Sequence, residues 1–274
     1  MARLLAFLVC IAMLSASCAH TTTPSAAPHL PTYSRASFIV ENSSVQPGSE
    51  AKIGIQFSMD DGWHIYWQNP GDSGEPPRIQ WQLPAGVTVG TLEWPAPKRL
   101  NTTAGTDYGY EGTTVLVSTL RIPATVQPGS TIELGGDLRW LVCHDVCVPQ
   151  RTQLSVPFRI ASRNSLDDKA HLLLQSAAER IPKPLPHSFK PVVTSTADSF
   201  RLTLATSNAV SQAEFFPEQE EQIDNGAPQK VSTNRGILRL TVKKAENLQH
   251  DPERLKGVIV LDGRETYKLD LPVH

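Results

Sequence analysis

Residues 138–158 read LRWLVCHDVCVPQRTQLSVPF, and apolar side chains alternate with polar ones on both sides of a short break. Alternation of this kind is typical of half-buried β-strands. A loop of three residues, 144–146, predicts a hairpin that places Cys143 opposite Cys147. Opposed residues of antiparallel strands lie about 4.5–5.5 Å apart between Cα atoms, which suits a disulfide. In one straight strand the same atoms would lie about 13 Å apart, too far for a bridge.

The parity of the two strands predicts which face the cysteines occupy. The apolar faces comprise Leu138, Trp140 and Val142 on the first strand, and Val148, Thr152, Leu154, Val156 and Phe158 on the second. Cys143 and Cys147 then both fall on the wetter face, where a bridge is open to attack by a thiolate. Pro149 cannot donate a hydrogen bond to a neighbour, so we expect an edge strand there.

Similar runs extend outward from the hairpin over residues 38–160. Alternating segments at 53–59, 79–83 and 115–117 are separated by turn sequences such as QPG and NPGD. Short strands at this spacing predict a β-sandwich of immunoglobulin-like size over residues 37–161. All five tryptophans fall in this part of the chain, and we expect most of them in its core.

The pattern changes after the first sandwich. Within residues 165–180 apolar side chains recur at helical spacing, and IPKPLPHSFKP at 181–191 is typical of a stiff linker. We therefore assign residues 162–191 to a helix and a Pro-rich linker. Alternating runs beyond them predict a second, smaller β-domain over 192–274, without cysteine or tryptophan. The predicted fold class is all-β.

The N-terminus predicts export. A short basic start precedes the apolar stretch LLAFLVCIAML, which has the length of a signal peptide. Small residues before Cys18 predict a signal over residues 1–17, a lipid on Cys18 and a polar tether over 18–36. Leu14 lies four residues before Cys18 instead of the usual three, so ordinary cleavage nearby is the alternative. Either way we expect the cell envelope or periplasm, an oxidising compartment.

Composition excludes some functions. The formal net charge is −2 and no dense run of Lys or Arg occurs, so neither nucleic acid nor an anionic membrane surface is an expected partner. With 40% hydrophobic residues the chain can build cores, which argues against disorder of the whole chain. No cofactor is predicted.

Three interpretations of the cysteine pair remain open. Cys143 and Cys147 can exchange with other thiols, they can form a structural disulfide that pins the hairpin, or they can join His144 as ligands of Cu(I) or Zn(II). Three ligands without a second cluster are a weak indication of metal. Asp145 tends to raise the pKa of a neighbouring thiol, whereas a protonated His144 lowers it.

Four blocks of the sequence resemble a known family. They are WHIYWQNPGDSGEPPRIQWQLPAG at 63–86, LEWPAPKR at 92–99, DYGYEG at 107–112 and LRWLVCHDVCVP at 138–149. Together they resemble the N-terminal periplasmic domain of the DsbD/ScsB thiol:disulfide interchange proteins, more closely the ScsB-like branch. The second β-domain, with AEFFPEQ at 213–219, resembles the second sandwich of that branch.

The resemblance implies an immunoglobulin-like sandwich whose cysteines, Cys143 and Cys147 here, shuttle between dithiol and disulfide. In the family an aromatic residue of a cap loop shields the bridge. Tyr108 and Tyr110 are the candidates for that role, and a turn or core position is the alternative for both. The loop at residues 69–74 is a family signature for which the sequence suggests only a rigid turn.

The resemblance also implies partners. Full-length members continue into a membrane domain and a thioredoxin-like domain, and neither is found in this sequence. We therefore expect exchange in trans with a thioredoxin-like envelope protein or a membrane electron transporter, with Cys147 linked to the partner and Cys143 as the resolving cysteine. The local sequence agrees, because Cys147 begins an edge-like strand whereas Cys143 follows an apolar run and is expected to be better covered. The alternative is a non-catalytic envelope binding protein, for example one that handles copper, whose cysteine pair is structural or binds metal.

Overall fold

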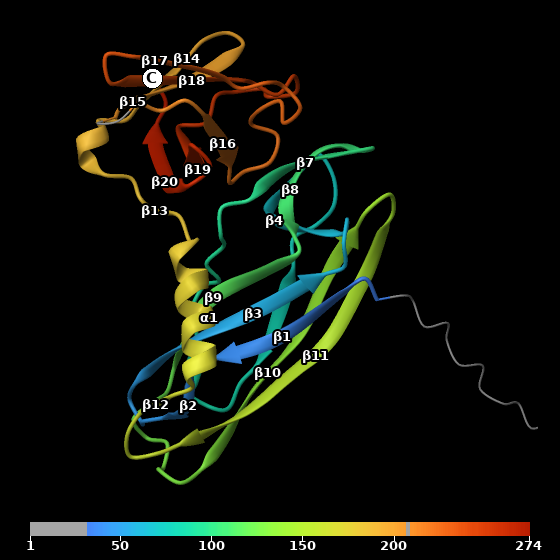
Figure 1. Ribbon diagram of the computed structural model, residues 1–274, viewed down its shortest axis with the longest axis vertical. Helices are drawn as coiled ribbons and strands as arrows, with labels where there is room; N and C mark the ends of the chain where they lie inside the picture. The colour runs from blue at the N-terminus through green and yellow to red at the C-terminus, as the bar shows by residue number, and fades with distance from the viewer. Residues whose placement is uncertain (1–31, 207–208) are drawn as a thin grey trace, which may run out of the picture. The chain divides into compact units, whose positions relative to one another are not determined.

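The alternating segments form four β-sheets in the computed structural model, which describes residues 32–206 and 209–274 (Figure 1). These residues belong to one compact unit that begins at Thr32. The predicted signal, the Cys18 lipid site and the tether up to residue 31 lie outside the described residues. Among those described, no helix has the length and apolar character needed to cross a membrane. The predicted all-β class is confirmed.

The first sandwich consists of two sheets. One has the strand order β1 (Ser34–Val40), β3 (Glu50–Met59), β9 (Thr113–Arg121) and β6 (Thr88–Val89). The other has the order β12 (Ser165–Leu166), β2 (Asn42–Val45), β11 (Cys147–Ile160), β10 (Thr131–Cys143), β4 (His64–Gly71), β8 (Gly105–Glu111) and β7 (Lys98–Thr102), and β5 (Arg78–Gln82) also pairs with β10.

Apolar side chains of the two sheets meet between them, as the period of two requires. Phe57 of β3 packs edge-on against Trp140 of β10, with ring centroids 5.7 Å apart. The prediction that most tryptophans lie in the core holds only in part: Trp67 and Trp140 are buried, whereas the other three are half-buried and pack against the core. One of these three, Trp63, stacks on Tyr33 at 3.7 Å. Burial of this apolar surface is the main stabilisation of the sandwich.

The single α-helix of the described residues, α1 (Asp168–Glu179), covers the outer face of the smaller sheet (Figure 1). Its N-cap Asp167 accepts a hydrogen bond of 2.9 Å from the backbone N–H of Ala170, as expected of an acidic cap. Leu174 and Ala177 are buried against β1 and β9. The helix predicted within residues 165–180 is therefore confirmed.

The second sandwich has two sheets of four strands. One contains β13 (Lys183–Pro184), β20 (Glu265–Pro272), β19 (Arg254–Leu261) and β16 (Ala213–Pro217) in that order, and the other contains β14 (Val192–Ser195), β15 (Ser199–Ala205), β18 (Ile237–Lys243) and β17 (Lys230–Asn234). A short 3₁₀ helix, His187–Phe189, lies between β13 and β14.

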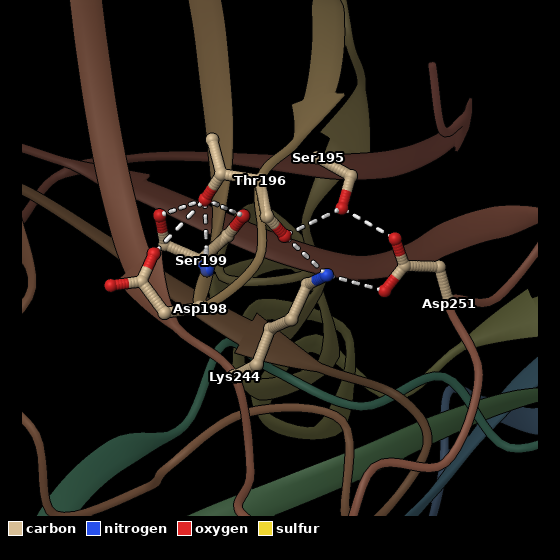
Figure 2. Close-up of polar contacts among 6 residues, drawn as sticks. All are labelled: Ser195, Thr196, Asp198, Ser199, Lys244 and Asp251. Carbon is tan, nitrogen blue, oxygen red and sulfur yellow. Dashed lines mark hydrogen bonds and ion pairs between the residues drawn. The ribbon is translucent and has the colours of Figure 1, made fainter.

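A polar cluster closes one turn of the second sandwich (Figure 2). Lys244, whose side chain is 12% exposed, pairs with Asp251 at 2.5 Å and donates to the carbonyl of Thr196 at 2.7 Å. Ser195 donates to the same carboxylate. The hydrogen bond from Lys244 is the main reason that the pKa of Asp251 is lowered. Every charged group of this cluster has a partner, so it stabilises the turn between β14 and β15.

Candidate functional site

The two cysteines lie at the end of the long β10–β11 hairpin. The strands pair from Thr131↔Arg159 to Cys143↔Cys147, so the cysteines are the last opposed residues before the turn. Their Cα atoms are 4.1 Å apart and a disulfide joins them. Within the turn the backbone N–H of His144 donates to the carbonyl of Val146 at 3.2 Å. The predicted hairpin and pairing are confirmed.

The two cysteines differ in exposure. Cys147 is exposed, whereas Cys143 is only 2% exposed. This agrees with the expectation that Cys143, which follows an apolar run, is better covered than Cys147. Strand parity alone predicts the wetter face for both residues and does not account for the burial of Cys143. That burial arises because β4 pairs with β10 through His64↔Cys143 and places the Tyr66 hydroxyl 3.0 Å from Cys143 Sγ. Of the two residues, only Cys147 is exposed to solvent.

Tyr66 is the side chain in contact with the bridge. It is buried on β4, two residues after His64, and its hydroxyl donates to Cys143 Sγ at 3.0 Å and lies 3.4 Å from Cys147 Sγ. Burial raises the pKa of Tyr66, the Ser73 hydroxyl lowers it, and the Asp107 carboxylate raises it again, so that the net direction is upward. The hydroxyl therefore stays protonated at neutral pH and remains a donor to sulfur.

The loop of residues 69–74, called here the NPGDSG loop, covers Tyr66. Gly74 has φ +81°, and a Cβ added there would overlap the Tyr66 ring, so only glycine fits this position. Ser73 lies beside it, with its hydroxyl 3.5 Å from the Tyr66 hydroxyl. The loop is thus the outer layer over the ring that contacts Cys143.

The carboxylate of Asp107 holds the NPGDSG loop in place through hydrogen bonds. The backbone N–H and the hydroxyl of Ser73 donate to its carboxylate at 2.9 and 3.0 Å, and the Thr102 hydroxyl donates at 3.2 Å. Asp107 is 1% exposed, and a carboxylate so deeply buried requires such donors. The sequence assigned no role to Tyr66 or Asp107. Their only sequence signal was membership of the WHIYW and DYGYEG blocks.

The cap role predicted for Tyr108 and Tyr110 is corrected by their contacts. Tyr108 is fully buried, and its hydroxyl donates to Asn225 Oδ1 at 2.8 Å. Tyr110 is also buried, and its hydroxyl donates to the carbonyl of Pro95 at 2.8 Å. Both therefore follow the core alternative, and the aromatic ring at the disulfide is that of Tyr66. Alternation along β8 alone could not tell which of its neighbours the rings meet.

The polar residues of the turn face solvent. His144 Nδ1 lies 3.0 Å from the Asp145 carboxylate, and their side chains are 48% and 80% exposed. An ion pair so open to water is weak. Their predicted influence on the thiols stays a prediction.

His64 is the buried counterpart on the neighbouring strand. Its Nε2 has no hydrogen-bond partner among the described residues, and its ring lies 5.3 Å from that of Tyr66. Burial lowers the pKa of His64 more than Asp107 and Glu111 raise it. The imidazole is therefore neutral at pH 7. Within residues 32–206 and 209–274, no group of three or more His, Cys, Asp or Glu side chains is arranged to hold a metal ion.

Comparisons with known proteins identify the first sandwich. Residues 35–158 match the family model of the N-terminal part of thiol:disulfide interchange protein DsbD. The N-terminal periplasmic domain of ScsB from Proteus mirabilis has a similar structure, with a TM-score of 0.64 and 16% identity over 88% of this chain and 91% of that chain. No curated protein matches the sequence.

A second solved structure is only distantly similar. The 35 kDa C-terminal fragment of the major pilin GBS80 of Streptococcus agalactiae matches over 87% of this chain and 91% of its own, with 8% identity and a TM-score of 0.28. That score is too low to support an argument. The ScsB match supports the fold of both sandwiches, and the family model supports thiol–disulfide exchange as the general chemistry of the disulfide. Through residues 35–158 the chain therefore belongs to the family of the DsbD N-terminal domain.

Proposed function

We propose that this chain is an envelope thiol–disulfide exchange protein in which Cys147 reacts with a partner and Cys143 is the resolving cysteine. The observation that carries the proposal is the unequal exposure of the two cysteines: Cys147 is exposed to solvent, whereas Cys143 is buried and its sulfur accepts a hydrogen bond from Tyr66. Exchange needs one accessible sulfur for attack and a second that completes the reaction. A bridge that served only to pin the hairpin has no need of this asymmetry.

The chemistry runs through a mixed disulfide. A thiolate of a reduced partner attacks Cys147 Sγ, a bond forms between these two sulfurs, and the Cys143–Cys147 bond breaks. Cys143 leaves as a thiolate, which the Tyr66 hydroxyl stabilises by the hydrogen bond it already donates. The second partner thiolate then attacks the partner's own sulfur and releases Cys147. The partner becomes a disulfide and this domain a dithiol, and the reverse steps return the two electrons.

Side chains around Cys147 supply a surface for the partner. Val146 is 64% exposed, and the stacked rings of Tyr33 and Trp63 lie beside the turn, with Trp63 5.8 Å from the His144 ring. An apolar and aromatic rim around a reactive sulfur suits transient docking of another protein. The partner classes we propose are a thioredoxin-like envelope protein and a membrane electron transporter, each supplied in trans.

We further propose that the protein works in the periplasm, anchored by a lipid on Cys18. Two observations support this location: the apolar stretch before Cys18, and the structural similarity to the ScsB domain, which is itself periplasmic. Mass spectrometry of protein from the native host is expected to find an N-terminal, acylated Cys18. An unmodified N-terminus elsewhere contradicts acylation and leaves export standing.

The redox assignment is tested by trapping the mixed disulfide. In the Cys143→Ala variant, Cys147 attacks an oxidised partner and no resolving thiol remains, so a covalent complex is expected on a non-reducing gel. The matched Cys147→Ala variant is expected to trap far less, because Cys143 is buried. If neither variant traps a partner and reduction of the bridge unfolds the first sandwich, the disulfide is structural and the proposal is wrong.

A further inference from the structure

The NPGDSG loop over the redox site is hydrogen-bonded at its beginning to the second sandwich. Asn69 is 1% exposed, and its Nδ2 donates to the carbonyls of Pro217 and Gln219 at 2.8 and 3.2 Å. Its Oδ1 accepts the backbone N–H of Gly71 at 3.0 Å. One buried amide thus joins the turn of the loop to residues 217–227, which begin at the end of β16 and are called here the anchor segment.

A second link joins the middle of the loop to the same segment. Asn225 Nδ2 donates to Asp72 Oδ1 at 2.8 Å, and the other oxygen of Asp72 accepts the backbone N–H of Thr106 at 2.7 Å. Asn225 is itself held, because its Oδ1 accepts from Tyr108 and its carbonyl accepts from Arg99. The anchor segment therefore presents an oriented donor to a charged acceptor, which is the stronger kind of hydrogen bond.

Apolar packing supports both links. Phe216 is the residue immediately before the anchor segment. Its ring packs edge-on against Tyr108 and Trp67, with centroid distances of 5.2 and 6.4 Å. Phe216 is fully buried and belongs to the core of the first sandwich. The anchor segment is thus held in register with the sheet that carries Tyr66.

We propose that the second sandwich is a positioning device for the redox site. Its anchor segment holds the NPGDSG loop down on Tyr66, and Tyr66 in turn keeps Cys143 Sγ covered, so that an incoming thiol reaches only Cys147. The path runs from Asn225 to Asp72, from the neighbouring Ser73 and Gly74 to Tyr66, and from there to the sulfur. This inference rests on the proposed function only in giving the shielding a purpose, since the shielding itself can be measured without a partner.

The test compares the reactivity of each cysteine alone. Cys143 is measured in the Cys147→Ala background and Cys147 in the Cys143→Ala background, by timed alkylation with iodoacetamide. Peptide mass spectrometry follows each thiol, so that Cys10 and Cys18 are counted separately. Asn225→Ala and Asn225→Asp are then added to both backgrounds. The Asp variant keeps the size of the side chain and the acceptor for Tyr108, but places an oxygen against Asp72 where the donor was.

Thr233→Val is the control variant. The Thr233 hydroxyl donates to the carbonyl of Val210 at 2.7 Å within the second sandwich and does not contact the loop, so the change removes one hydrogen bond without freeing the anchor segment. Without an Asn225 change, Cys147 in the Cys143→Ala background is expected to react at least about tenfold faster than Cys143 in the Cys147→Ala background, as its exposure implies. Either Asn225 variant is expected to speed alkylation of Cys143 by about tenfold, the factor typical of one lost hydrogen bond to a charged group. Alkylation of Cys147 is expected to stay within about twofold.

Three results overturn the proposal. The first is that Cys143 is alkylated as fast as Cys147 when Asn225 is unchanged. The second is that neither Asn225 variant changes the alkylation rate of Cys143. The third is that Thr233→Val raises this rate as much as the Asn225 variants do. Failure of the proposed function has a different signature, because it removes the trapped partner of the Cys143→Ala variant and leaves these alkylation rates as they are.

Discussion

Removing the Tyr66 hydroxyl is expected to slow reduction of the disulfide without disturbing the fold. Tyr66→Phe keeps the ring beneath Gly74 and deletes the donor that lies 3.0 Å from Cys143 Sγ. When a thiol attacks Cys147, negative charge develops on Cys143, and the deleted hydrogen bond is the one that stabilises it. A hydrogen bond to a charged group contributes about 1.5–3 kcal/mol.

The size of the effect follows from how much of this charge is present in the transition state. If about half of the hydrogen-bond energy is expressed there, the barrier rises by about 0.8–1.5 kcal/mol, and reduction slows roughly 4- to 12-fold. The assay is stopped-flow reduction by dithiothreitol, followed by tryptophan fluorescence, since Trp63 lies beside the turn.

Tyr110→Phe is the matched control. It deletes a buried tyrosine hydroxyl in the same sandwich, bonded to the Pro95 carbonyl and not to sulfur. Its reduction rate is expected to equal that of the wild type, and its free energy of unfolding to fall by about 1 kcal/mol, the usual worth of one hydrogen bond. A Tyr66→Phe rate within twofold of the wild type, or an equal slowing in Tyr110→Phe, refutes the role given to Tyr66.

Three further outcomes follow from the same contacts. Because burial lowers the pKa of His64 below 6.5, the unfolded chain binds a proton at this residue before the folded chain does as the pH falls. The free energy of unfolding therefore falls as the pH drops through 6.5, until the folded imidazole is protonated as well. Urea titrations at pH 7.5 and 5 are expected to show a smaller loss for His64→Gln, and an equal loss contradicts the neutral imidazole. The disulfide closes a loop of only five residues, so its reduction is expected to lower the free energy of unfolding by about 2 kcal/mol and the melting temperature by roughly 4–8 °C. The far-UV circular dichroism spectrum is expected to stay native. Loss of its β signal on reduction shows instead that the disulfide is structural. Gly74→Ala is expected to lower the free energy of unfolding by at least about 2 kcal/mol, against about 1 kcal/mol for Gly112→Ala. Both glycines have positive φ, but only Gly74 lies against a ring, that of Tyr66. Equal losses in denaturant titrations show that Gly74 is not in close contact with Tyr66.

The sequence alone determined the strands, the hairpin and the cysteine pairing. Each depends on a local pattern: the period of two along a strand, the length of a turn, and two cysteines only four residues apart. Helix α1 was equally predictable, because its apolar spacing and its cap are contained within its own residues.

Only the tertiary structure decided what covers each sulfur. A period of two tells which face a side chain occupies, but not which strand lies next in the sheet, so parity alone could not predict the burial of Cys143 beside β4. Tyr66 is 77 residues from Cys143, Ser73 is 34 from Asp107, and Asn69 is 148 from Pro217. These contacts depend on the order of strands and on the packing of one sandwich against another, which no local pattern encodes. The cysteine pair could thus be named from the sequence, and the apolar run before Cys143 predicted that it is the better covered of the two. The identity of the side chains that cover it is decided by the fold.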